Sequence, residues 1–398
     1  MQEKLRNYFS EYLNKESFFI DKKLLTHSYV PEEILHRDEQ ISTIAKILAP
    51  SLKLEQPSNL FIYGTTGTGK SVAIKYIFNE MLAANTSNFN AIYVNCKLRK
   101  VSDTEYRMLA YILRELNFKV PDTGLPTETL YTKLFELVDS KKQIIILALD
   151  ELDVLINKIG DEILYNLTRI NSELVNSKIS IIGISNDISF TDKLDPRVKS
   201  SLSEEEIIFP PYNAPQLNDI IEQRANKALK QDVYSEGVIR KCAAIAAQEQ
   251  GDARRALDMI RVAAEIAERN DEIKITEKHV GLAEQKLELD RVVELAKMQP
   301  RHSQVTLYSI LKLFEKSEDN ILTGDVYEIY TQLCKRNGYR ILTQRRISDL
   351  ISELNMLGII STKVISKGRY GRTREIRLAI AKKPFDILKN HFSTLFEI

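Results

Sequence analysis

The sequence predicts an α/β protein in three parts: a parallel sheet covered by helices, a segment of helices alone, and a C-terminal domain of helices with a β-hairpin. A strand-like apolar run at 60–63 leads into a glycine-rich loop and then a helical pattern. The runs at 144–149 and 179–185 are mainly apolar, as is typical of parallel strands buried on both faces. Residues 211–285 show helical spacing without a strand pattern.

The loop after the first strand reads Gly-Thr-Thr-Gly-Thr-Gly-Lys-Ser. Its glycines let backbone N–H groups point at an anion, its lysine reaches the outer phosphates, and its serine hydroxyl completes a Mg²⁺ site. Helical spacing over 72–82 supplies the helix that this mechanism needs. The alternative is a glycine-rich turn that binds nothing. We predict binding of ATP or ADP with Mg²⁺ through Gly64, Thr65, Thr66, Gly67, Thr68, Gly69, Lys70 and Ser71.

The next two predicted strands each end in polar side chains. Asp150 and Glu151 close the run that begins at Gln143, and Asn186 follows the run 179–185. We expect Asp150, with Ser71, to hold the Mg²⁺, and Glu151 to polarise the water that attacks the γ-phosphate. Asn186 can orient that water. The alternatives are an acidic helix start at Asp150 and a turn at Asn186.

Two arginines beyond these strands complete the predicted catalytic set. Arg197 lies in the run Asp195-Pro196-Arg197, from which it can meet a γ-phosphate held by a neighbouring molecule. Arg254 falls in the first turn of a helix that Asp252 is placed to cap, after a helix end at Gly251. The alternative for each arginine is a surface ion pair.

The C-terminal part is basic. Residues 301–398 hold 17 Lys and Arg against 10 Asp and Glu, or +7, so the preceding part carries −6 within a total of +1. Apolar spacing predicts three helices, the third capped by Thr343, and then a hairpin with a basic glycine tip. Such a helix and tip suit duplex DNA, although a solvated basic surface is the alternative. The residues predicted to contact DNA are Arg345, Arg346, Ser348, Lys367, Gly368, Arg369, Tyr370, Gly371, Arg372 and Arg374.

These patterns predict a nucleotide-binding base at 1–210, a helical lid at 211–285, a linker at 286–300 and a winged-helix domain at 301–398. An amphipathic helix, and no signal peptide, is expected near the N-terminus from the spacing of Leu5, Tyr8, Phe9, Tyr12 and Leu13. Because the three cysteines are far apart, we expect neither a disulfide framework nor a zinc module, and we expect no membrane partner.

In this order, the phosphate loop, the Asp-Glu strand, the Asn-ended strand and the Gly-Asp-Ala-Arg helix resemble AAA+ ATPases. Within that class, the chain resembles archaeal origin-recognition and cell-division-cycle type replication initiators over almost its whole length. The features that carry this resemblance are His36-Arg37-Asp38, the run from Asp195 to Leu202 followed by Phe-Pro-Pro-Tyr at 209–212, and the basic winged helix. Asp38 stands where Glu is more frequent. The resemblance implies an adenine pocket of Val30, Pro31, His36, Arg37 and Tyr212.

The resemblance also makes 95–127 an initiator-specific insertion, where Lys97, Arg99 and Lys100 contact DNA or form a solvated basic loop. It implies an ATP-switched initiator with weak ATPase activity that binds duplex origin DNA and helps recruit or load the replicative helicase. Other initiator paralogues are candidate partners, and the expected location is cytoplasmic, at the nucleoid. Related proteins also place the trans-acting arginine a few positions after Arg197, where this chain has Ser200, Ser201 and Leu202.

Two other functions fit the same motifs. One is a ring-forming DNA motor with a winged helix, of the branch-migration type, for which strong DNA-stimulated turnover and hexamers are expected. The other is an ATP-sensing transcription regulator, for which binding confined to promoters is expected. Neither explains the insertion at 95–127 as well.

Overall fold

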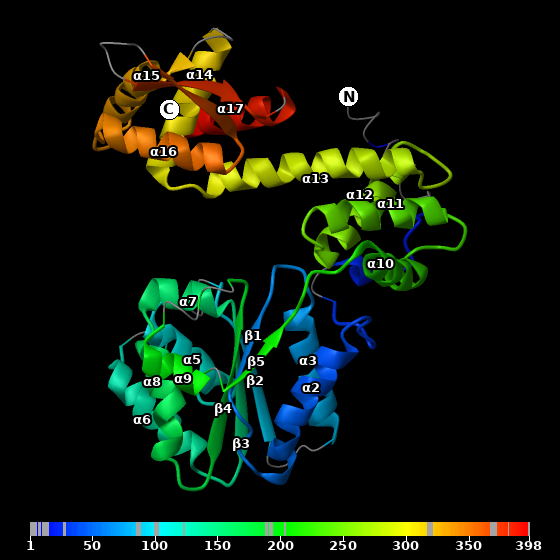
Figure 1. Cartoon of the computed structure of the whole chain (residues 1–398), viewed down its shortest axis with the longest axis vertical. Coiled ribbons are helices and arrows are strands. Elements are labelled where there is room, and N and C mark those ends of the chain that lie inside the picture. The colour runs from blue at the N-terminus through cyan, green and yellow to red at the C-terminus, as the bar shows by residue number, and fades with distance from the viewer. Residues whose placement is uncertain are drawn as a thin grey trace. The chain divides into compact units, whose positions relative to one another are not determined.

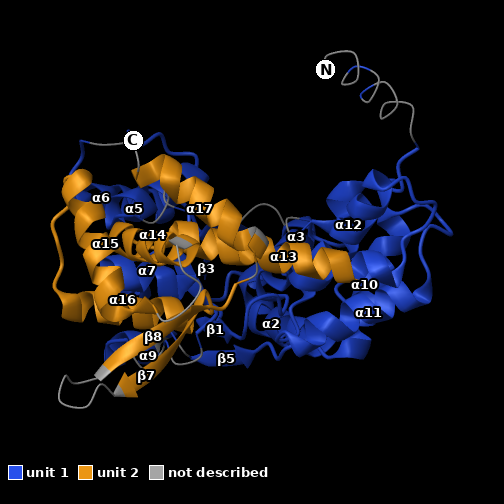
Figure 2. Ribbon diagram, turned by 90° about the horizontal axis from the view of Figure 1, so that it is seen from above, with its two compact units in different colours: residues 1–280 blue, residues 281–398 orange. Residues whose placement is uncertain are grey.

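The computed structural model forms two compact units, residues 1–280 and 281–398, which Figure 2 colours separately. The helix predicted near the N-terminus lies outside the described residues, apart from Arg6 and Phe9. The described residues are 6, 9, 16–26, 29–84, 89–98, 103–121, 124–187, 190, 194–202, 204–316, 321–366, 372–380 and 382–396.

The first unit contains a five-stranded parallel sheet with the strand order β2-β3-β4-β1-β5. Sequence patterns predict β1, β3 and β4 but miss the two edge strands, because β2 mixes polar and apolar residues and β5 is short and begins with two glutamates. The strands are β1 (Leu60–Tyr63), β2 (Phe89–Asn95), β3 (Ile144–Asp150), β4 (Lys178–Ser185) and β5 (Glu205–Ile208).

Helices cover both faces of this sheet, with α2 and α3 on one face and α5 to α9 on the other (Figure 1). Successive strand residues therefore enter different cores: Leu60 and Ile62 pack in one, and Phe61 packs in the other. The helices are α2 (Asp38–Leu48), η2 (Ala49–Lys53), α3 (Lys70–Ala84), α5 (Glu105–Glu115), α6 (Thr127–Val138), α7 (Leu152–Ile159), α8 (Glu162–Arg169), η3 (Ile170–Ser172) and α9 (Pro196–Leu202).

Three helices of the same unit form the lid: α10 (Ala214–Ala228), α11 (Glu236–Gln248) and α12 (Ala253–Arg269). An N-terminal segment that includes η1 (Lys22–Leu25) is bound to them, because Ile20 N donates to Ala228 O over 2.8 Å and Lys230 N donates to Phe18 O over 2.8 Å. The chain thus crosses the lid before it enters the sheet domain.

The second unit has the predicted three helices and hairpin. A further strand and the helix α17 were not predicted, although Leu388, Phe392 and Phe396 recur at helical spacing and are buried. The sheet has the order β6-β8-β7. The elements are α13 (Glu277–Met298), which begins in the first unit and spans most of the predicted linker, α14 (Arg301–Lys316), β6 (Ile321–Leu322), α15 (Thr323–Arg336), α16 (Gln344–Met356), β7 (Ile360–Ser366), β8 (Arg372–Leu378) and α17 (Lys382–Phe396).

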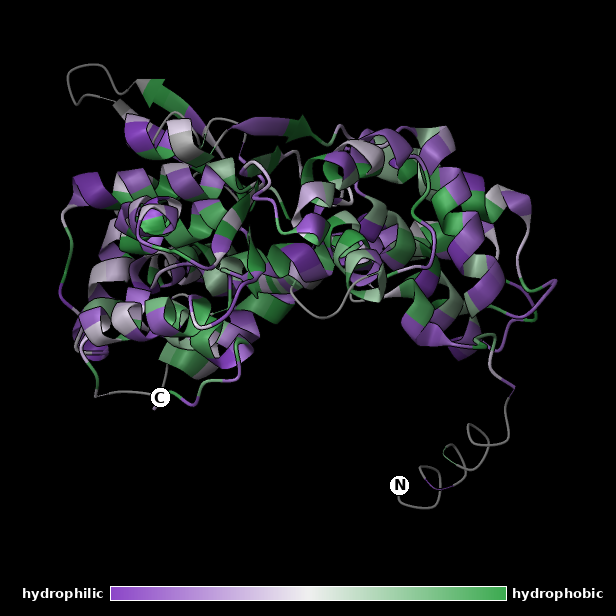
Figure 3. Cartoon of the chain, turned by 90° about the horizontal axis from the view of Figure 1, so that it is seen from below, coloured by the Kyte–Doolittle hydropathy of each residue, from purple (hydrophilic) through white to green (hydrophobic). Residues whose placement is uncertain are grey.

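Helices of both units carry hydrophilic and hydrophobic residues together (Figure 3). Within the described part of the chain, no helix combines the length and the apolar character needed to cross a bilayer.

Candidate functional site

The phosphate loop joins β1 to α3 at the carboxyl edge of the sheet. The lid contacts this loop. Gly67 and Gly69 have φ values of +77° and +93°, where side chains are rarely tolerated. A Cβ at Gly67 would lie 1.7 Å from Asp252 Oδ1, and one at Gly69 would lie 2.8 Å from Tyr212 Oη. Ala253 N also donates to Gly67 O over 3.2 Å. Both glycines are therefore needed for close approach as well as for the turn.

Lys70 is almost fully buried at the start of α3. Its Nζ donates to Gly64 O over 2.7 Å, to Thr65 O over 2.8 Å and to Asn186 Oδ1 over 2.8 Å. These contacts use all three ammonium donors and fix the group at the centre of the loop. Burial lowers the pKa of Lys70 to about 8, although the nearby Asp150 charge opposes this shift.

Asp150 is held through both carboxylate oxygens. Its Oδ1 accepts from Glu151 N over 2.9 Å, and its Oδ2 accepts from Ser71 Oγ over 2.7 Å and from the Tyr93 hydroxyl. Glu151 itself has a left-handed backbone, with φ of 58°, and its Oε2 accepts from Asn186 Nδ2 over 2.8 Å. Asn186 thereby links the lysine of the loop to the glutamate.

The two predicted arginines lie in different surroundings. Arg254 is exposed in the first turn of α12, where Asp252 accepts its backbone N–H over 2.8 Å. Arg197 is also exposed, and its Nε and Nη2 donate to the two oxygens of Asp195 over 3.0 and 2.9 Å. This pairing lowers the pKa of Asp195 to about 2. Arg197 does not line the cavity beside the phosphate loop of its own chain.

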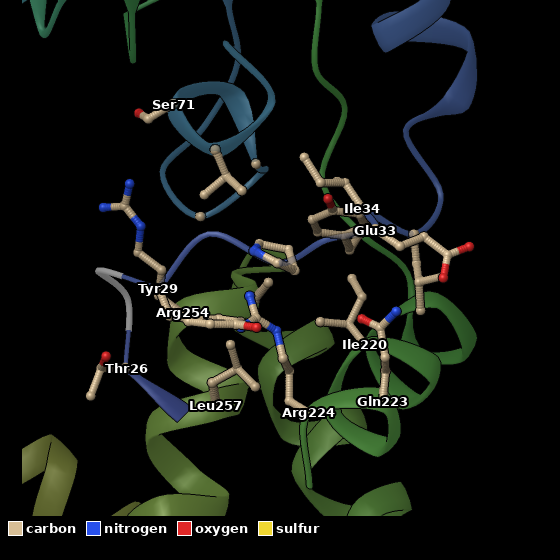
Figure 4. Close-up of a pocket in the computed structure, with 17 residues that line it drawn as sticks. Thr26, Tyr29, Glu33, Ile34, Ser71, Ile220, Gln223, Arg224, Arg254 and Leu257 are labelled. Carbon is tan, nitrogen blue, oxygen red and sulfur yellow. The ribbon is translucent and has the colours of Figure 1, made fainter. Parts of the chain in front are cut away.

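A pocket lies between the phosphate loop, the N-terminal segment and the lid (Figure 4). Gly67, Gly69 and Ser71 line one side, and lid residues line the other. An apolar slot beside a phosphate loop suits a nucleotide base. The lining residues are Thr26, Tyr29, Pro31, Glu33, Ile34, Leu35, Gly67, Gly69, Ser71, Val72, Tyr212, Ile220, Gln223, Arg224, Ala253, Arg254 and Leu257.

Of the residues predicted for the adenine pocket, Pro31 and Tyr212 line this cavity. Arg37 is buried behind them: its guanidinium lies 3.9 Å from the Tyr212 ring centroid, and Nε donates to Thr68 O over 3.0 Å. Burial lowers the pKa of Arg37. His36, in the left-handed region, faces the lid residue Asp219 over 2.8 Å, and Val30 does not line the cavity.

Arg224 was not predicted. It is buried on α10, its Nη1 donates to Leu24 O over 3.2 Å, and its guanidinium lies 4.5 Å from the Tyr29 ring centroid. Burial lowers its pKa. Arg224 thus fastens the N-terminal segment to the lid while it faces the pocket (Figure 4).

Three of the predicted DNA-binding residues line a second, open cavity in the winged helix. Arg345, Ser348 and Arg374 line it. Arg374 Nη1 donates to Ser348 O over 2.8 Å and to the Ser352 hydroxyl, so the hairpin is tied to α16. Arg346 is exposed and lies 3.8 Å from Asp349.

Of the other residues predicted to contact DNA, the structure describes only some. Arg372 begins β8, and Lys97 is exposed after β2. The remainder lie outside the described residues: Arg99, Lys100, Lys367, Gly368, Arg369, Tyr370 and Gly371.

Comparison with known proteins matches each part of the chain. An AAA domain matches residues 53–186, the Cdc6 AAA+ ATPase-type lid domain matches 218–285, and the CDC6 C-terminal winged helix domain matches 294–386. An ORC1-type DNA replication protein of Thermococcus onnurineus is 53% identical over 384 residues, which cover 94% of this chain and 92% of that protein. This chain belongs to the ORC1-type DNA replication proteins. An ORC1-type relative from Pyrococcus furiosus is 51% identical and covers 98% of this chain and 94% of its own length.

Two solved structures share the fold. The structure of the Aeropyrum pernix ORC1 protein in complex with DNA has a TM-score of 0.82 and 40% identity, and covers 95% of this chain and 98% of its own. Cdc6p from Pyrobaculum aerophilum, at 23% identity, 96% and 99% coverage and a TM-score of 0.61, shows the fold alone. The predicted family and fold class, an AAA+ base with a helical lid and a winged helix, are confirmed, and membership sets aside the motor and the transcription regulator.

The sequence of this ORC1-type chain did not reveal Tyr93, Arg224 or most of the pocket lining. Tyr93 lies on the edge strand that was not predicted, and the lining comes from segments almost 200 residues apart in sequence. The available signal was alternation within β2, whose partly buried Tyr93 stands between Ile92 and Val94, which are buried in one core.

Proposed function

We propose that this ORC1-type protein binds ATP or ADP with Mg²⁺, recognises duplex DNA at replication origins and uses its nucleotide state as a switch. One observation carries the DNA part: the Aeropyrum pernix ORC1 protein was solved in complex with DNA and shares its fold and 40% of its sequence with 95% of this chain. The Aeropyrum pernix ORC2 structures, solved as ADPNP–ADP complexes and in an ADP form, show only the fold because identity is 20%.

The nucleotide phosphates are proposed to bind the loop at residues 64–71. Backbone N–H groups and Lys70 meet the phosphates, and the slot around Pro31 and Tyr212 receives the adenine. Of the other predicted adenine residues, Arg37 stacks behind Tyr212 and His36 pairs with the lid, so we propose that both position the pocket.

A magnesium ion fits the donors at this edge of the sheet. The hydroxyl of Ser71 and the carboxylate of Asp150 lie 2.7 Å apart, and Mg²⁺ prefers oxygen ligands, with one or two carboxylates beside the substrate phosphates. Ser71 and Asp150 would hold it. The ion would neutralise the charge that develops on the phosphates.

Hydrolysis is proposed to be slow in a single molecule. Glu151, oriented by Asn186, polarises the attacking water, and Arg254 approaches the γ-phosphate from the lid. Arg197 does not line the pocket of its own chain and is paired with Asp195 at the surface, which suits an arginine offered to a neighbouring molecule. The protein is thus proposed to be a weak ATPase that acts as a switch.

The switch is proposed to work through the contact between the phosphate loop and α12. Gly67 touches Asp252, and Arg254 lies two residues further along. A γ-phosphate that draws in Arg254 changes the same junction, so lid position depends on the nucleotide.

The winged helix is proposed to read duplex DNA with α16 in the major groove and the hairpin tip on the backbone or in the minor groove. The predicted domain boundaries, at 210, 285 and 300, and DNA contact by the insertion at 95–127 remain proposals. On the resemblance alone, the protein also helps recruit or load the replicative helicase, with paralogues as partners, at the nucleoid.

Footprinting on genomic fragments, with ATP or with ADP, tests this function. We expect protection of a few discrete sites by the intact chain, and loss of that protection in Arg345→Ala and in Arg369→Ala/Arg372→Ala. Lys389→Ala is the matched control, because it removes one cation from α17, where Lys389 pairs with Glu315 over 2.5 Å. Lys70→Ala shows whether nucleotide shapes the footprint.

Uniform weak protection that the Arg345 and hairpin variants leave unchanged would contradict sequence-selective binding. Equal loss with Lys389→Ala would attribute the effect to net charge alone.

A further inference from the structure

Tyr93 contacts the predicted magnesium site although it belongs to none of the motifs. Its hydroxyl donates to Asp150 Oδ2, the same oxygen that accepts from Ser71. It reaches that oxygen from β2, which pairs with β3 so that Asn95 lies opposite Asp150. A side chain from the neighbouring strand therefore fixes the orientation of the carboxylate.

The hydrogen bonds around Asp150 leave little freedom. An ionised carboxylate offers about four lone-pair positions. Glu151 N–H occupies one on Oδ1, and the Ser71 and Tyr93 hydroxyls occupy those on Oδ2. Among the described contacts, a position on Oδ1 stays open, so Tyr93 helps decide which side of the carboxylate can accept from the water shell of a metal ion.

The Tyr93 ring is itself held. Lys75 Nζ, on α3, lies 4.4 Å from the ring centroid. The Tyr93 hydroxyl carries one proton to donate, and it donates that proton to the Asp150 carboxylate. Ser71 also donates to Asp150, but it is itself a predicted metal ligand, because a metal ion would bind the lone pairs of its oxygen.

We propose that Tyr93 is a positioning residue that holds Asp150 in the orientation required by Mg²⁺. This inference rests on the proposed binding of nucleotide with Mg²⁺. Partners that orient a ligating carboxylate typically change metal affinity by about 10–100-fold when they are removed.

The test is Tyr93→Phe in the full chain, which deletes one hydroxyl and keeps the ring. Binding of a non-hydrolysable ATP analogue is measured in EDTA and across a Mg²⁺ titration. We expect the affinity in EDTA to stay within about twofold of the parent, while the Mg²⁺ concentration for half-maximal enhancement rises about tenfold. An unchanged Mg²⁺ titration overturns the proposal, as does an equal loss with and without Mg²⁺.

Tyr63→Phe is the matched control. It removes a hydroxyl from the end of β1 in the same sheet, where Tyr63 faces Glu206 over 3.4 Å, and its Mg²⁺ titration should match the parent. If the parent itself shows no Mg²⁺ enhancement, the proposed metal site fails and not only the role of Tyr93. Lys75→Met is a second variant, should Tyr93→Phe not fold: it frees the ring, and we expect a smaller shift in the same direction, whereas no shift counts against the proposal.

Discussion

At the scale of single residues, the Asn186 side chain connects two other residues of the candidate nucleotide site. Its amide oxygen accepts from Lys70, and its amide nitrogen donates to Glu151. One side chain therefore links Lys70, which is proposed to meet the phosphates, to Glu151, which is proposed to polarise the attacking water. The sequence identified all three residues by their places after strands and in the loop. It could not show that they form one hydrogen-bonded chain, because that depends on strand order.

The lowered pKa of Lys70 predicts that nucleotide binding depends on pH. Bound phosphate favours the charged ammonium, so affinity is constant well below the pKa of about 8 and falls as pH rises through it. From pH 7 to pH 9 we expect the Kd for ATP to rise about tenfold. Calorimetry in two buffers with different ionisation enthalpies would also detect proton uptake on binding near pH 8.

The comparison variant is Lys70→Met, which should bind ATP weakly and lose this pH dependence. The same slope in both proteins would mean that another group titrates.

At the scale of elements, Asp252 both caps α12 and contacts the phosphate loop. Asp252 accepts from Arg254 N and Arg255 N over 2.8 and 3.3 Å and touches Gly67. Asp252→Ala should cost about 1 kcal/mol of unfolding free energy from the lost cap. It should also weaken ATP binding more than ADP binding, because Arg254 loses its fixed position. Thermal unfolding and nucleotide titrations measure the two effects.

Asn213→Ala separates the two effects, since Asn213 caps α10 in a capping box with Gln216. A similar loss of stability is expected, without a change in the preference for ATP over ADP. Should both variants change that preference alike, the effect would come from lid stability in general.

The hairpin and α16 are expected to act as one element because Arg374 ties them together. Arg374→Ala should destabilise the winged helix by about 1–3 kcal/mol, since it leaves Ser348 O without this donor. We expect DNA binding to weaken for all sequences alike, as measured by fluorescence anisotropy. Arg377→Ala, which removes an exposed arginine paired with Glu375 over 2.8 Å, should have a small effect.

Helices and strands with a clear pattern of apolar residues, or with a clear capping residue, could be predicted from the sequence. Elements without these features could not. The run 144–150 is buried at every position, which is why its apolar letters predicted β3. The Thr343 cap of α16 is formed, since Thr343 accepts from Arg346 N. In contrast, β5 lies at the edge of the described sheet beside β1 and carries exposed glutamates, so its sequence lacks the pattern of a buried strand.

At the scale of the whole molecule, Arg197 predicts that hydrolysis is shared between molecules. A mixture of Lys70→Ala, which lacks a working phosphate loop, and Arg197→Ala, which has one, should hydrolyse ATP faster than either alone. The first supplies Arg197 to the second. The rate should rise with protein concentration, measured as phosphate release. No gain on mixing would exclude Arg197 as the arginine acting in trans.

The order of domains followed from the sequence because each has its own signature in motif, helical spacing or charge. The pocket did not, because its walls come from the N-terminal segment, the loop and two lid helices. Tyr29 and Arg224 face each other only after the chain has folded across the lid. Contacts of this separation leave no local pattern in a single sequence.

The buried guanidinium groups of Arg37 and Arg224 have a kinetic consequence. Neither has a carboxylate partner in the described part of the chain, and both lie beside the pocket, where low polarity screens their fields poorly. This uncompensated positive charge attracts an approaching polyphosphate before the two are in contact. Capture of nucleotide should therefore be fast and should slow as ionic strength rises, while the rate of release changes little.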